Sequence, residues 1–405
     1  MKVAFLTYGA SPIPATKGGA VENLIEDLLD ENENYGLLDF TVFSIWEKEA
    51  TRQAQKYNHT KFHFVKCPSI IDIGDKVIYL FSKKILKKGN LISYRYIFRR
   101  LYVMSHYPKL LLEEDFDKVV LVTNSTLFFI LKNKKIYKKY KDKFVYYLHN
   151  EVRSLFKCEK EAASIHSLIG VSEFVNSSFK KLVPTLSEKQ CYILKNCIDT
   201  EAFLNVHQNI VQKYREKFGI TDNDFVVVFA GRIVKEKGAL ETIEAIKACN
   251  RNNIKLLVVG GGFYSSDIVD DYSITLQRAS KELKSRLIFT GYIDYKDMPA
   301  IYALGNVAVL PSIWDEPAGL TMVEAVISGL PLITTNSGGI PEYIPYNSAI
   351  ILNRDANLTN NISKMICKLM DDKKMSNELA SVGKLLINEF NLKNYYSNFC
   401  DVIQK

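Results

Sequence analysis

The sequence predicts an α/β protein of two doubly wound domains, each a parallel sheet with helices on both faces. Three observations lead to this fold class. Strand-length apolar runs alternate with longer helix-like stretches along the chain. The second half repeats the plan of the first, and Gly, Pro or Thr follows each of its apolar runs, at the sheet edge where such folds bind ligands. A chain of 405 residues is long enough for two such domains.

The predicted strands are short runs rich in aliphatic and aromatic residues. They cover residues 3–8, 40–45, 118–123, 144–148 and 167–171 in the first half, and 225–230, 255–259, 287–290, 307–310 and 331–334 in the second. We expect a first domain at residues 1–200, a second at 201–390, and a helix at 391–405 that returns to the first domain. The domains are expected to join near residues 196–202.

Cysteine usage and hydropathy exclude several classes of protein. The seven cysteines are scattered and contain no Cys-x-x-Cys pair, so neither a zinc ribbon nor a redox motif is supported. An odd, scattered count is typical of reduced thiols in the cytosol. Residues 1–6 fit a first strand better than a secretory signal, and no apolar run reaches the roughly 18–20 residues of a membrane-spanning helix. We therefore expect a cytoplasmic protein, soluble or peripheral to a membrane.

The net charge of +8 is concentrated in the first half. From Lys76 to Leu112 nine residues are basic and none is acidic, and aromatic residues lie among the cations. The segment from Lys83 to Arg100 is predicted to bind an anionic membrane surface, at the inner face of the plasma membrane, because aromatic residues favour the headgroup level and cations attract anionic lipid. A solvated helix face over a local core is the alternative. Nucleic acid is not expected, because no nucleic-acid motif accompanies the cations.

Two carboxylates follow the predicted strand at 307–310. Glu316 lies in the loop after the strand, and Glu324 lies about two turns into a helix that begins near Gly319. The backbone N–H groups of Ala318, Gly319 and Leu320 lie at the start of this helix, where the dipole favours an anion or a sugar hydroxyl. The alternative is that these residues have only a structural role, in a surface loop and in a helix with salt bridges.

Glycine turns follow two other predicted strands. One turn is accompanied by cations, and the other contains a glycine pair suited to phosphate binding. After the strand at 225–230, Gly231 turns the chain and Arg232 and Lys237 supply two positive charges. A diphosphate leaving group needs such charges, because its departure leaves negative charge to be stabilised. After the first strand, Gly18 and Gly19 precede a predicted helix and suit the close approach of a phosphate, although a tight turn explains them equally well.

Together these motifs resemble the retaining glycosyltransferases of family four, the group 1 glycosyltransferases. The resemblance covers nearly the whole chain and rests on motifs in a fixed order at the sheet ends: Gly18-Gly19, Gly231-Arg232, Lys237-Gly238, Glu316 and Glu324 with seven residues between them, and Gly338-Gly339 with Glu342. It implies the GT-B fold, in which two Rossmann-like domains face each other across a cleft. The first domain would then bind the acceptor and the second the nucleotide-sugar donor.

The resemblance also implies an activity. The chain would transfer a hexose-type sugar with retention and without a metal, from a nucleotide diphosphate sugar, commonly a UDP-sugar in this family. The acceptor would be a saccharide or a lipid-linked intermediate of bacterial surface-polysaccharide biosynthesis. No cofactor is expected beyond the nucleotide sugar, which is a substrate.

Each matching position receives a role from the resemblance. Glu324 would bind the ribose, Glu316 would orient the donor sugar, and Arg232 and Lys237 would neutralise the diphosphate. His149, after the strand at 144–148, matches a position near the reacting sugar. The remaining implied donor contacts are Gly18, Gly19, Gly231, Gly291, Tyr292, Ala318, Gly319 and Leu320. At the position of Ala318 the family often has Phe. The resemblance therefore does not predict the shape of the sugar pocket or the identity of the donor sugar.

Two other functions remain as alternatives. A sugar-nucleotide epimerase of related fold would release an altered sugar without using an acceptor. A non-enzymatic, membrane-associated scaffold would have lost the charged pocket residues, which this chain retains. The triplet Asp115-Phe116-Asp117 precedes a strand, at the wrong end for a metal clamp, and Gly260-Gly261-Gly262 matches only part of a dinucleotide fingerprint, so a nicotinamide oxidoreductase is not expected.

Overall fold

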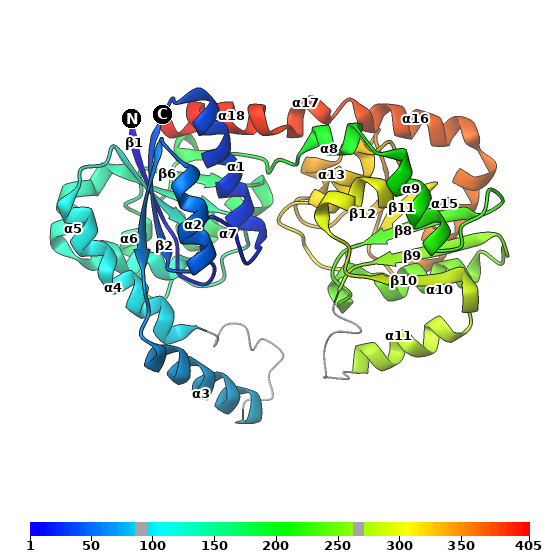
Figure 1. Ribbon diagram of the computed structural model, residues 1–405, viewed down its shortest axis with the longest axis horizontal. Helices are drawn as coiled ribbons and strands as arrows, with labels where there is room; N and C mark the ends of the chain where they lie inside the picture. The colour runs from blue at the N-terminus through cyan, green and yellow to red at the C-terminus, as the bar shows by residue number, and fades with distance from the viewer. Residues whose placement is uncertain (86–95, 262–270) are drawn as a thin grey trace. The chain divides into compact units, whose positions relative to one another are not determined.

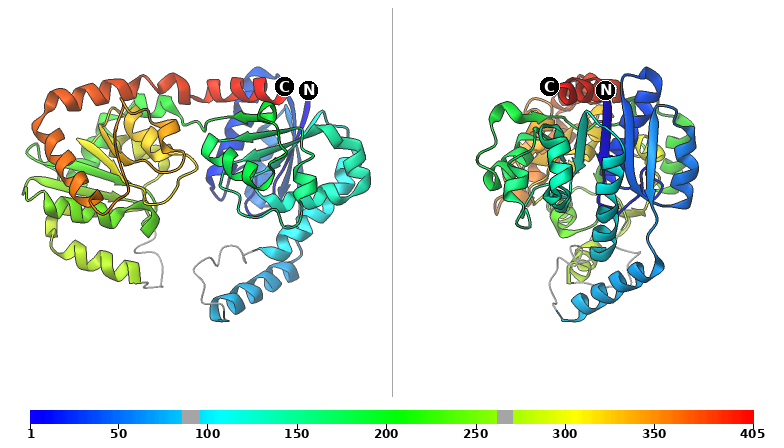
Figure 2. Two further views of the ribbon diagram at one scale, coloured as in Figure 1. Left: turned by 180° about the vertical axis from the view of Figure 1, so that it is seen from behind. Right: turned by 90° about the vertical axis from the view of Figure 1, so that its left-hand side faces the viewer.

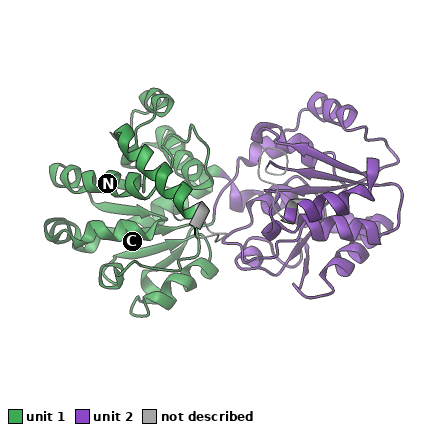
Figure 3. Cartoon of the chain, turned by 90° about the horizontal axis from the view of Figure 1, so that it is seen from below, with its two compact units in different colours: residues 1–195, 392–405 green, residues 196–391 purple. Residues whose placement is uncertain are grey.

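The computed structural model describes residues 1–85, 96–261 and 271–405 and divides into two compact units. The first unit comprises Met1–Lys195 with Leu392–Lys405, and the second comprises Asn196–Asn391 (Figure 3). The limits predicted from the sequence, after residues 200 and 390, lie a few residues away. Each unit contains one parallel sheet, and we describe each by itself.

The sheet of the first unit has seven parallel strands in the order β3-β2-β1-β4-β5-β6-β7 (Figure 1). These strands are β1 (Lys2–Leu6), β2 (Asp39–Ile45), β3 (Thr60–Val65), β4 (Lys118–Val122), β5 (Phe144–Leu148), β6 (Ser167–Gly170) and β7 (Cys191–Ile193). All five residues of β5 are buried, because helices cover both faces of a parallel sheet.

The sheet of the second unit has six parallel strands in the order β10-β9-β8-β11-β12-β13. They are β8 (Phe225–Ala230), β9 (Ile254–Val259), β10 (Leu287–Gly291), β11 (Val307–Leu310), β12 (Leu332–Thr335) and β13 (Ile350–Leu352). Both sheets therefore run outward from their first strand in both directions, so the predicted pair of doubly wound, Rossmann-like units is confirmed.

Three strands were not predicted from the sequence: β3, β7 and β13. All three lie at a sheet edge, where one side of the strand has no neighbour in the sheet. Strands β7 and β13 have only three residues each, and β3 alternates apolar residues with Lys61 and His63. Edge strands are commonly short and polar, which weakens the apolar signal that identified the central strands.

Helices connect the strands in both units. Those of the first unit are α1 (Ala20–Tyr35), α2 (Lys48–Gln53), α3 (Ser69–Ile85), α4 (Ile97–Glu113), α5 (Lys134–Tyr140), α6 (Glu159–Ala162), α7 (Glu173–Leu182) and α18 (Leu392–Gln404). Those of the second unit are α8 (Thr200–Leu204), α9 (Gln208–Lys217), α10 (Ala239–Ala248), α11 (Asp271–Lys281), α12 (Met298–Tyr302), α13 (Leu320–Ile327), α14 (Ile340–Tyr343), α15 (Leu358–Asp371), α16 (Lys373–Lys384) and α17 (Ile387–Phe390). Within the described ranges, none of these helices is long and apolar enough to cross a bilayer.

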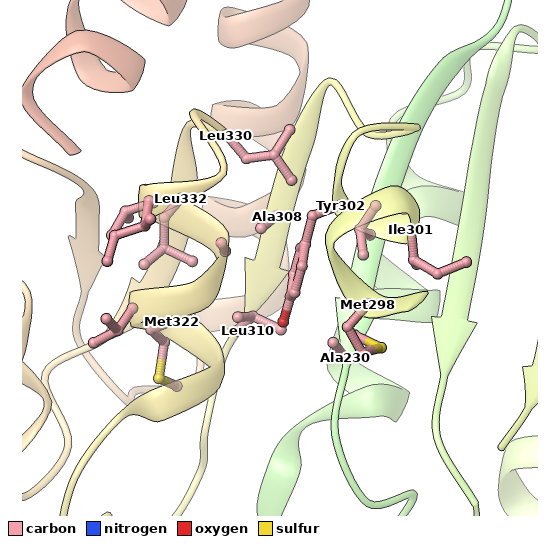
Figure 4. Close-up of a cluster of buried hydrophobic side chains, with 14 of the residues drawn as sticks. Ala230, Met298, Ile301, Tyr302, Ala308, Leu310, Met322, Leu330 and Leu332 are labelled. Atoms are coloured by element: carbon pink, nitrogen blue, oxygen red, sulfur yellow. The ribbon is translucent and has the colours of Figure 1, made fainter. Parts of the chain in front are cut away.

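The second unit has a hydrophobic core on each face of its sheet. Alternate residues of β8 separate into the two cores: Val226 and Val228 enter one, whereas Val227 and Phe229 enter the other. The first core includes residues of α12 and α13 (Figure 4), and the second includes residues of α10 and α15. Burial on both faces holds the sheet rigid, so the loops at its carboxyl edge start from fixed positions.

The last helix, α18, belongs to the first unit and lies beside α1 (Figures 1 and 2). Phe399 is fully buried, and its ring lies 5.7 Å from the ring of Phe5 in β1, centroid to centroid. The hydroxyl groups of Tyr147 and Tyr395 are hydrogen-bonded at 2.6 Å, and the hydroxyl of Tyr396 donates to the side-chain oxygen of Asn32. The end of the chain thus completes the core of the unit in which the chain begins.

Replacing Phe399 by alanine should destabilise the first unit by about 3–5 kcal/mol, because a fully buried aromatic ring is lost and a cavity remains. Asn398→Ala, at an exposed position of the same helix, should change stability by less than about 0.5 kcal/mol and serves as the control. Urea unfolding followed by circular dichroism measures both effects. Equal unfolding midpoints for the two variants would show that α18 does not support this core.

Candidate active site

Loops that follow three strands of the second unit meet at Glu316. This residue lies in the loop between β11 and α13, and its backbone forms an isolated parallel bridge with Gly338, in the loop after β12. The N–H of Gly339 donates to the carbonyl oxygen of Glu316 at 2.7 Å. From the loop after β8, the Nζ of Lys237 lies 2.5 Å from Oε1 of Glu316. The structure therefore brings together motifs that are up to about a hundred residues apart in the sequence.

The carboxylate of Glu316 is held by two side chains. Only 5% of the residue is exposed, and its Oε1 accepts hydrogen bonds from Lys237 and from the hydroxyl of Ser312, the latter at 2.6 Å. A buried carboxylate requires such a charged partner and further hydrogen bonds. The pair fixes the position of Glu316 before any ligand binds.

Two glycines allow the loops to approach this closely. Gly338 has φ of 57°, and a Cβ atom at this position would lie 2.5 Å from the carbonyl oxygen of Glu316. Gly238 has φ of 77°, and a Cβ atom there would lie 2.2 Å from the carbonyl oxygen of Pro311. Any other residue would therefore combine a strained backbone with a steric clash at the point where the loops touch.

Hydroxyl groups that the sequence analysis did not select hold the loop after β11. The carbonyl oxygen of Ser312 accepts hydrogen bonds from Thr335 at 2.6 Å and from Ser337 at 3.0 Å. Both donors follow or end β12, the neighbouring strand. The sequence shows small hydroxyl residues after both strands. Their hydrogen bonds form because β11 and β12 are neighbours in the sheet, and the sequence does not show this strand order.

Glu324 lies in α13 and occupies a different environment. It is 6% exposed, and the hydroxyl of Tyr302 donates to its Oε2 at 3.0 Å. Burial raises the pKa of Glu324 to about 7, and hydrogen bonds from Tyr302 and Tyr295 act in the opposite direction. Figure 4 shows the ring of Tyr302 beside β11, with its hydroxyl directed to the Leu310 end of the strand. Tyr302 was not predicted from the sequence, because it precedes the strand and belongs to no motif.

The other predicted residues of the second unit lie on its carboxyl edge or next to it. Gly319 is buried and precedes α13 without a side chain that could cap the helix, and Ala318 and Leu320 pack against the adjacent core. Gly291 ends β10 with φ of 72°, and the side chain of Tyr292 after it is 77% exposed.

Arg232 follows the turn at Gly231 and is exposed. Among the described residues, its guanidinium has no ion pair or hydrogen bond within the protein, in contrast to the amine of Lys237. Gly231 has φ of 153°, and a Cβ atom on the neighbouring Gly260 would lie 2.0 Å from its carbonyl oxygen. The turn after β8 is therefore packed against the turn after β9, which leaves Arg232 on a fixed backbone with a side chain available to a ligand.

The predicted residues of the first unit lie at the carboxyl edge of its own sheet. Gly18 and Gly19 have φ of 69° and 126°, and Gly19 directly precedes α1. His149 follows β5 and is 5% exposed, and within the described part of the chain neither ring nitrogen has a hydrogen-bond partner. Burial lowers the pKa of His149 to about 3, so the imidazole is neutral at physiological pH.

Asp115 and Asp117, which the sequence did not favour as a metal clamp, contact other residues of the first unit. Asp115 pairs with Lys139 at 2.9 Å, and Asp117 accepts a hydrogen bond from the backbone N–H of Lys2 at 2.7 Å. Both residues precede β4, opposite the edge that carries the ligand loops. Across the described ranges there is no cluster of three or more His, Cys, Asp or Glu residues that could hold a metal ion. Two features predicted from the sequence extend beyond the described residues. The partial fingerprint after β9 continues into residues 262–265, which lie outside them. The segment from Lys83 to Arg100, expected to bind an anionic membrane surface, includes residues 86–95, which also lie outside them, so this contact remains a prediction.

Comparison with known proteins gives a consistent result. Residues 210–385 match the family described as glycosyl transferases group 1. The chain is 27% identical over 398 residues to the putative glycosyltransferase YtcC of Bacillus subtilis, covering 94% of this chain and 86% of that protein. It is 24% identical over 297 residues to the lipopolysaccharide 1,2-N-acetylglucosaminetransferase of Salmonella typhimurium, covering 70% of this chain and 71% of that protein.

A solved structure has the same fold over the whole chain. The Anabaena protein Alr3699/HepE, in complex with UDP and glucose, superposes with a TM-score of 0.71 at 16% identity, covering 100% of this chain and 99% of that one. At this identity the likeness establishes the fold and not the substrate. The match of residues 210–385 to group 1 glycosyl transferases, the curated relatives and the shared fold together support glycosyltransferase activity for this chain, and its fold is that of the GT-B glycosyltransferases.

Proposed function

We propose that the chain is a retaining, metal-independent hexosyltransferase that uses a nucleotide diphosphate sugar, a UDP-sugar by preference. The acceptor is a saccharide or a lipid-linked intermediate in bacterial surface-polysaccharide biosynthesis. The observation that carries the proposal is the ion pair between the partly exposed Lys237 and the buried Glu316, at the sheet edge where Glu324 also lies. The names of the Salmonella relative and of the Anabaena complex support a saccharide acceptor and a UDP-linked donor.

The leaving diphosphate would be stabilised by fixed positive charge. Lys237 is held in place by Glu316, and Arg232 offers a second cation from the same loop. The start of α13, which Gly319 leaves uncapped, adds backbone N–H groups and the positive end of the helix dipole. Charge that is in place before the reaction stabilises the transition state without reorganisation, and two cations with a helix start can take over the role of a divalent ion.

The two carboxylates would hold two parts of the donor. Glu324 lies in the helix and accepts hydrogen bonds from the ribose hydroxyls, a group that does not change during transfer. Glu316 lies in the loop and orients the sugar that reacts. Its bond to Lys237 couples the position of the sugar to the charge that receives the leaving group.

His149 would act in the first unit as a neutral imidazole. Burial lowers its pKa to about 3, so at physiological pH one ring nitrogen can donate a hydrogen bond and the other can accept one. Within the described residues both nitrogens are buried and lack a protein partner. This role remains a prediction from the family resemblance.

The proposal is tested by following transfer of a labelled sugar. A panel of nucleotide sugars is first screened for thermal stabilisation, since a ligand at about 100 times its dissociation constant stabilises the folded state by roughly 2.7 kcal/mol. The stabilising nucleotide sugar is then incubated with candidate acceptors and a chelator. Glycosylated acceptor with an unchanged anomeric configuration supports the proposal. A free, altered sugar with no glycosylated acceptor identifies an epimerase, and rescue by added magnesium rejects metal independence.

Removing either cation should slow the reaction strongly. Arg232→Ala and Lys237→Ala should each reduce kcat about 100-fold or more, because positive charge is needed most when the diphosphate leaves. Lys235→Ala is the matched control, since Lys235 is an exposed cation in the same short turn, Lys235–Lys237. Steady-state kinetics on correctly folded variants measures kcat for each of the three proteins. If the variants at 232 and 237 match Lys235→Ala, neither cation serves the diphosphate.

The two carboxylates should differ in their kinetic effects. Glu324→Gln should mainly raise KM for the sugar donor, because it weakens a contact present before and during the reaction. Glu316→Gln should mainly lower kcat, because it disturbs the orientation of the reacting sugar. The measurement is a donor titration of each variant, with circular dichroism as the folding control. Unchanged affinity and turnover in both variants would make the carboxylate pair structural.

Binding of the sugar donor should depend on pH near neutrality. Burial places the pKa of Glu324 at about 7, so affinity should fall as the pH decreases through this value and the carboxylate is protonated. The bond from Tyr302 lowers this pKa, so Tyr302→Phe should move the loss of affinity to higher pH. Tyr214→Phe removes a comparable bond, 2.7 Å from the Asp297 carboxylate, and should leave the profile unchanged. Calorimetric titration of UDP across pH 5.5–8.5 measures the midpoint; identical profiles in all three proteins would contradict the assignment.

A further inference from the structure

An ion pair at the carboxyl edge of the second sheet joins two loops whose strands are not neighbours. Arg354 lies two residues after the end of β13, and its Nη2 is 2.6 Å from Oδ1 of Asp315, in the loop between β11 and α13. In the sheet, β12 separates β11 from β13. The ion pair therefore reaches across the end of β12 and holds the residue next to Glu316.

Backbone hydrogen bonds join the same three loops. The N–H of Asn336, directly after β12, donates to the carbonyl oxygen of Leu352, the last residue of β13, at 2.8 Å. Further along the loop after β12, the N–H of Gly339 donates to the carbonyl oxygen of Glu316 at 2.7 Å. The ion pair closes a ring of contacts, because it connects the residue before Glu316 to the chain just beyond Leu352.

The loop of Glu316 is thus held from both sides by cations. Lys237, from the loop after β8, binds Glu316, and Arg354, from the loop after β13, binds the adjacent Asp315. Strands β8 and β13 lie on opposite sides of β11 in the strand order. Two neighbouring carboxylates of one loop are therefore tied to two different loops.

The exposure of the ion pair separates its effect on stability from its effect on position. The side chains of Arg354 and Asp315 are 32% and 49% exposed, and exposed ion pairs contribute little to the stability of the folded state. Turnover is far more sensitive to geometry, because a displacement of about 1 Å at a reacting group can reduce it about 100-fold.

We propose that Arg354 is a positioning residue, which holds the loop of Glu316 in place through its ion pair with Asp315. It acts on the donor sugar through Glu316 and need not touch the donor itself. The inference rests on the proposed function, in which Glu316 orients the reacting sugar. Loss of Arg354 should therefore resemble a partial loss of Glu316.

The position of the loop is measured without any activity, by tryptophan fluorescence of the full chain. Trp314 precedes Asp315, and its Nε1 is buried. The sequence contains one other tryptophan, Trp46, in the first unit, so Trp46→Phe gives a parent protein whose tryptophan signal comes from this loop. In this parent, Arg354→Ala and Asp315→Asn should each raise the acrylamide quenching constant at least about twofold, because the released loop opens to solvent.

The kinetic test separates a positioning role from a general structural one. Arg354→Ala should lower kcat about tenfold and change KM for the sugar donor less than about twofold, and Arg354→Lys should restore part of the loss, because it retains the charge. In a Glu316→Gln background, Arg354→Ala should have little further effect, because both changes act on the same group.

A second exposed ion pair of the same unit supplies the matched control. Arg251 precedes β9, at the opposite edge of the sheet, and lies 3.1 Å from Asp371, with side chains that are 47% and 60% exposed. Arg251→Ala should match the parent in quenching, kcat and KM. Circular dichroism and an unchanged urea midpoint show that each variant is folded.

Other outcomes overturn the proposal. If Arg354→Ala and Asp315→Asn are quenched like Arg251→Ala, the ion pair does not hold the loop. If quenching rises but kcat stays at the parental value, or if Arg354→Ala lowers kcat equally with and without Glu316, Arg354 is not a positioning residue for the reaction. A parent that transfers no sugar contradicts the proposed function, and the quenching then still decides whether Arg354 holds the loop.

Discussion

The contact between Lys237 and Glu316 is the interaction on which the carboxyl edge of the sheet in the second unit depends. The carboxylate of Glu316 is 5% exposed and is stabilised by a partner of opposite charge, which comes from the loop of another strand. The loops reach each other because Gly238 and Gly338 remove the side chains that would block them. The ion pair thus joins the loops after β8 and β11, and backbone contacts of Glu316 with Gly338 and Gly339 add the loop after β12.

The same sheet edge holds two carboxylates in two electrostatic states. Glu316 has an ammonium group and a hydroxyl as partners, whereas Glu324 has tyrosine hydroxyls and an apolar helix around it. Burial without a cation raises the pKa of Glu324 to about 7, so its charge responds to changes near neutral pH. Two glutamates eight positions apart in the sequence therefore have different electrostatic surroundings.

The sequence alone determined the fold class, because central strands of a parallel sheet are apolar on both faces and stand out between helices. It also predicted the resemblance to group 1 glycosyltransferases and selected Glu316, Glu324, Arg232 and Lys237 as candidate site residues, because these residues follow strands in a fixed order. The edge strands β3, β7 and β13 escaped prediction because short, partly polar strands carry a weak apolar signal.

Only the tertiary structure decided which of these residues touch. Ser312, Thr335 and Ser337 support the loop of Glu316, and Tyr302 supports Glu324, through hydrogen bonds between segments that strand order alone brings together. The orientation of helix α3 was also decided there. Periodicity shows that a helix has an apolar side, but the contacts of Asp72 and Asp75 with α4 set which side meets the protein. Such contacts join residues distant in the sequence, so no local pattern encodes them.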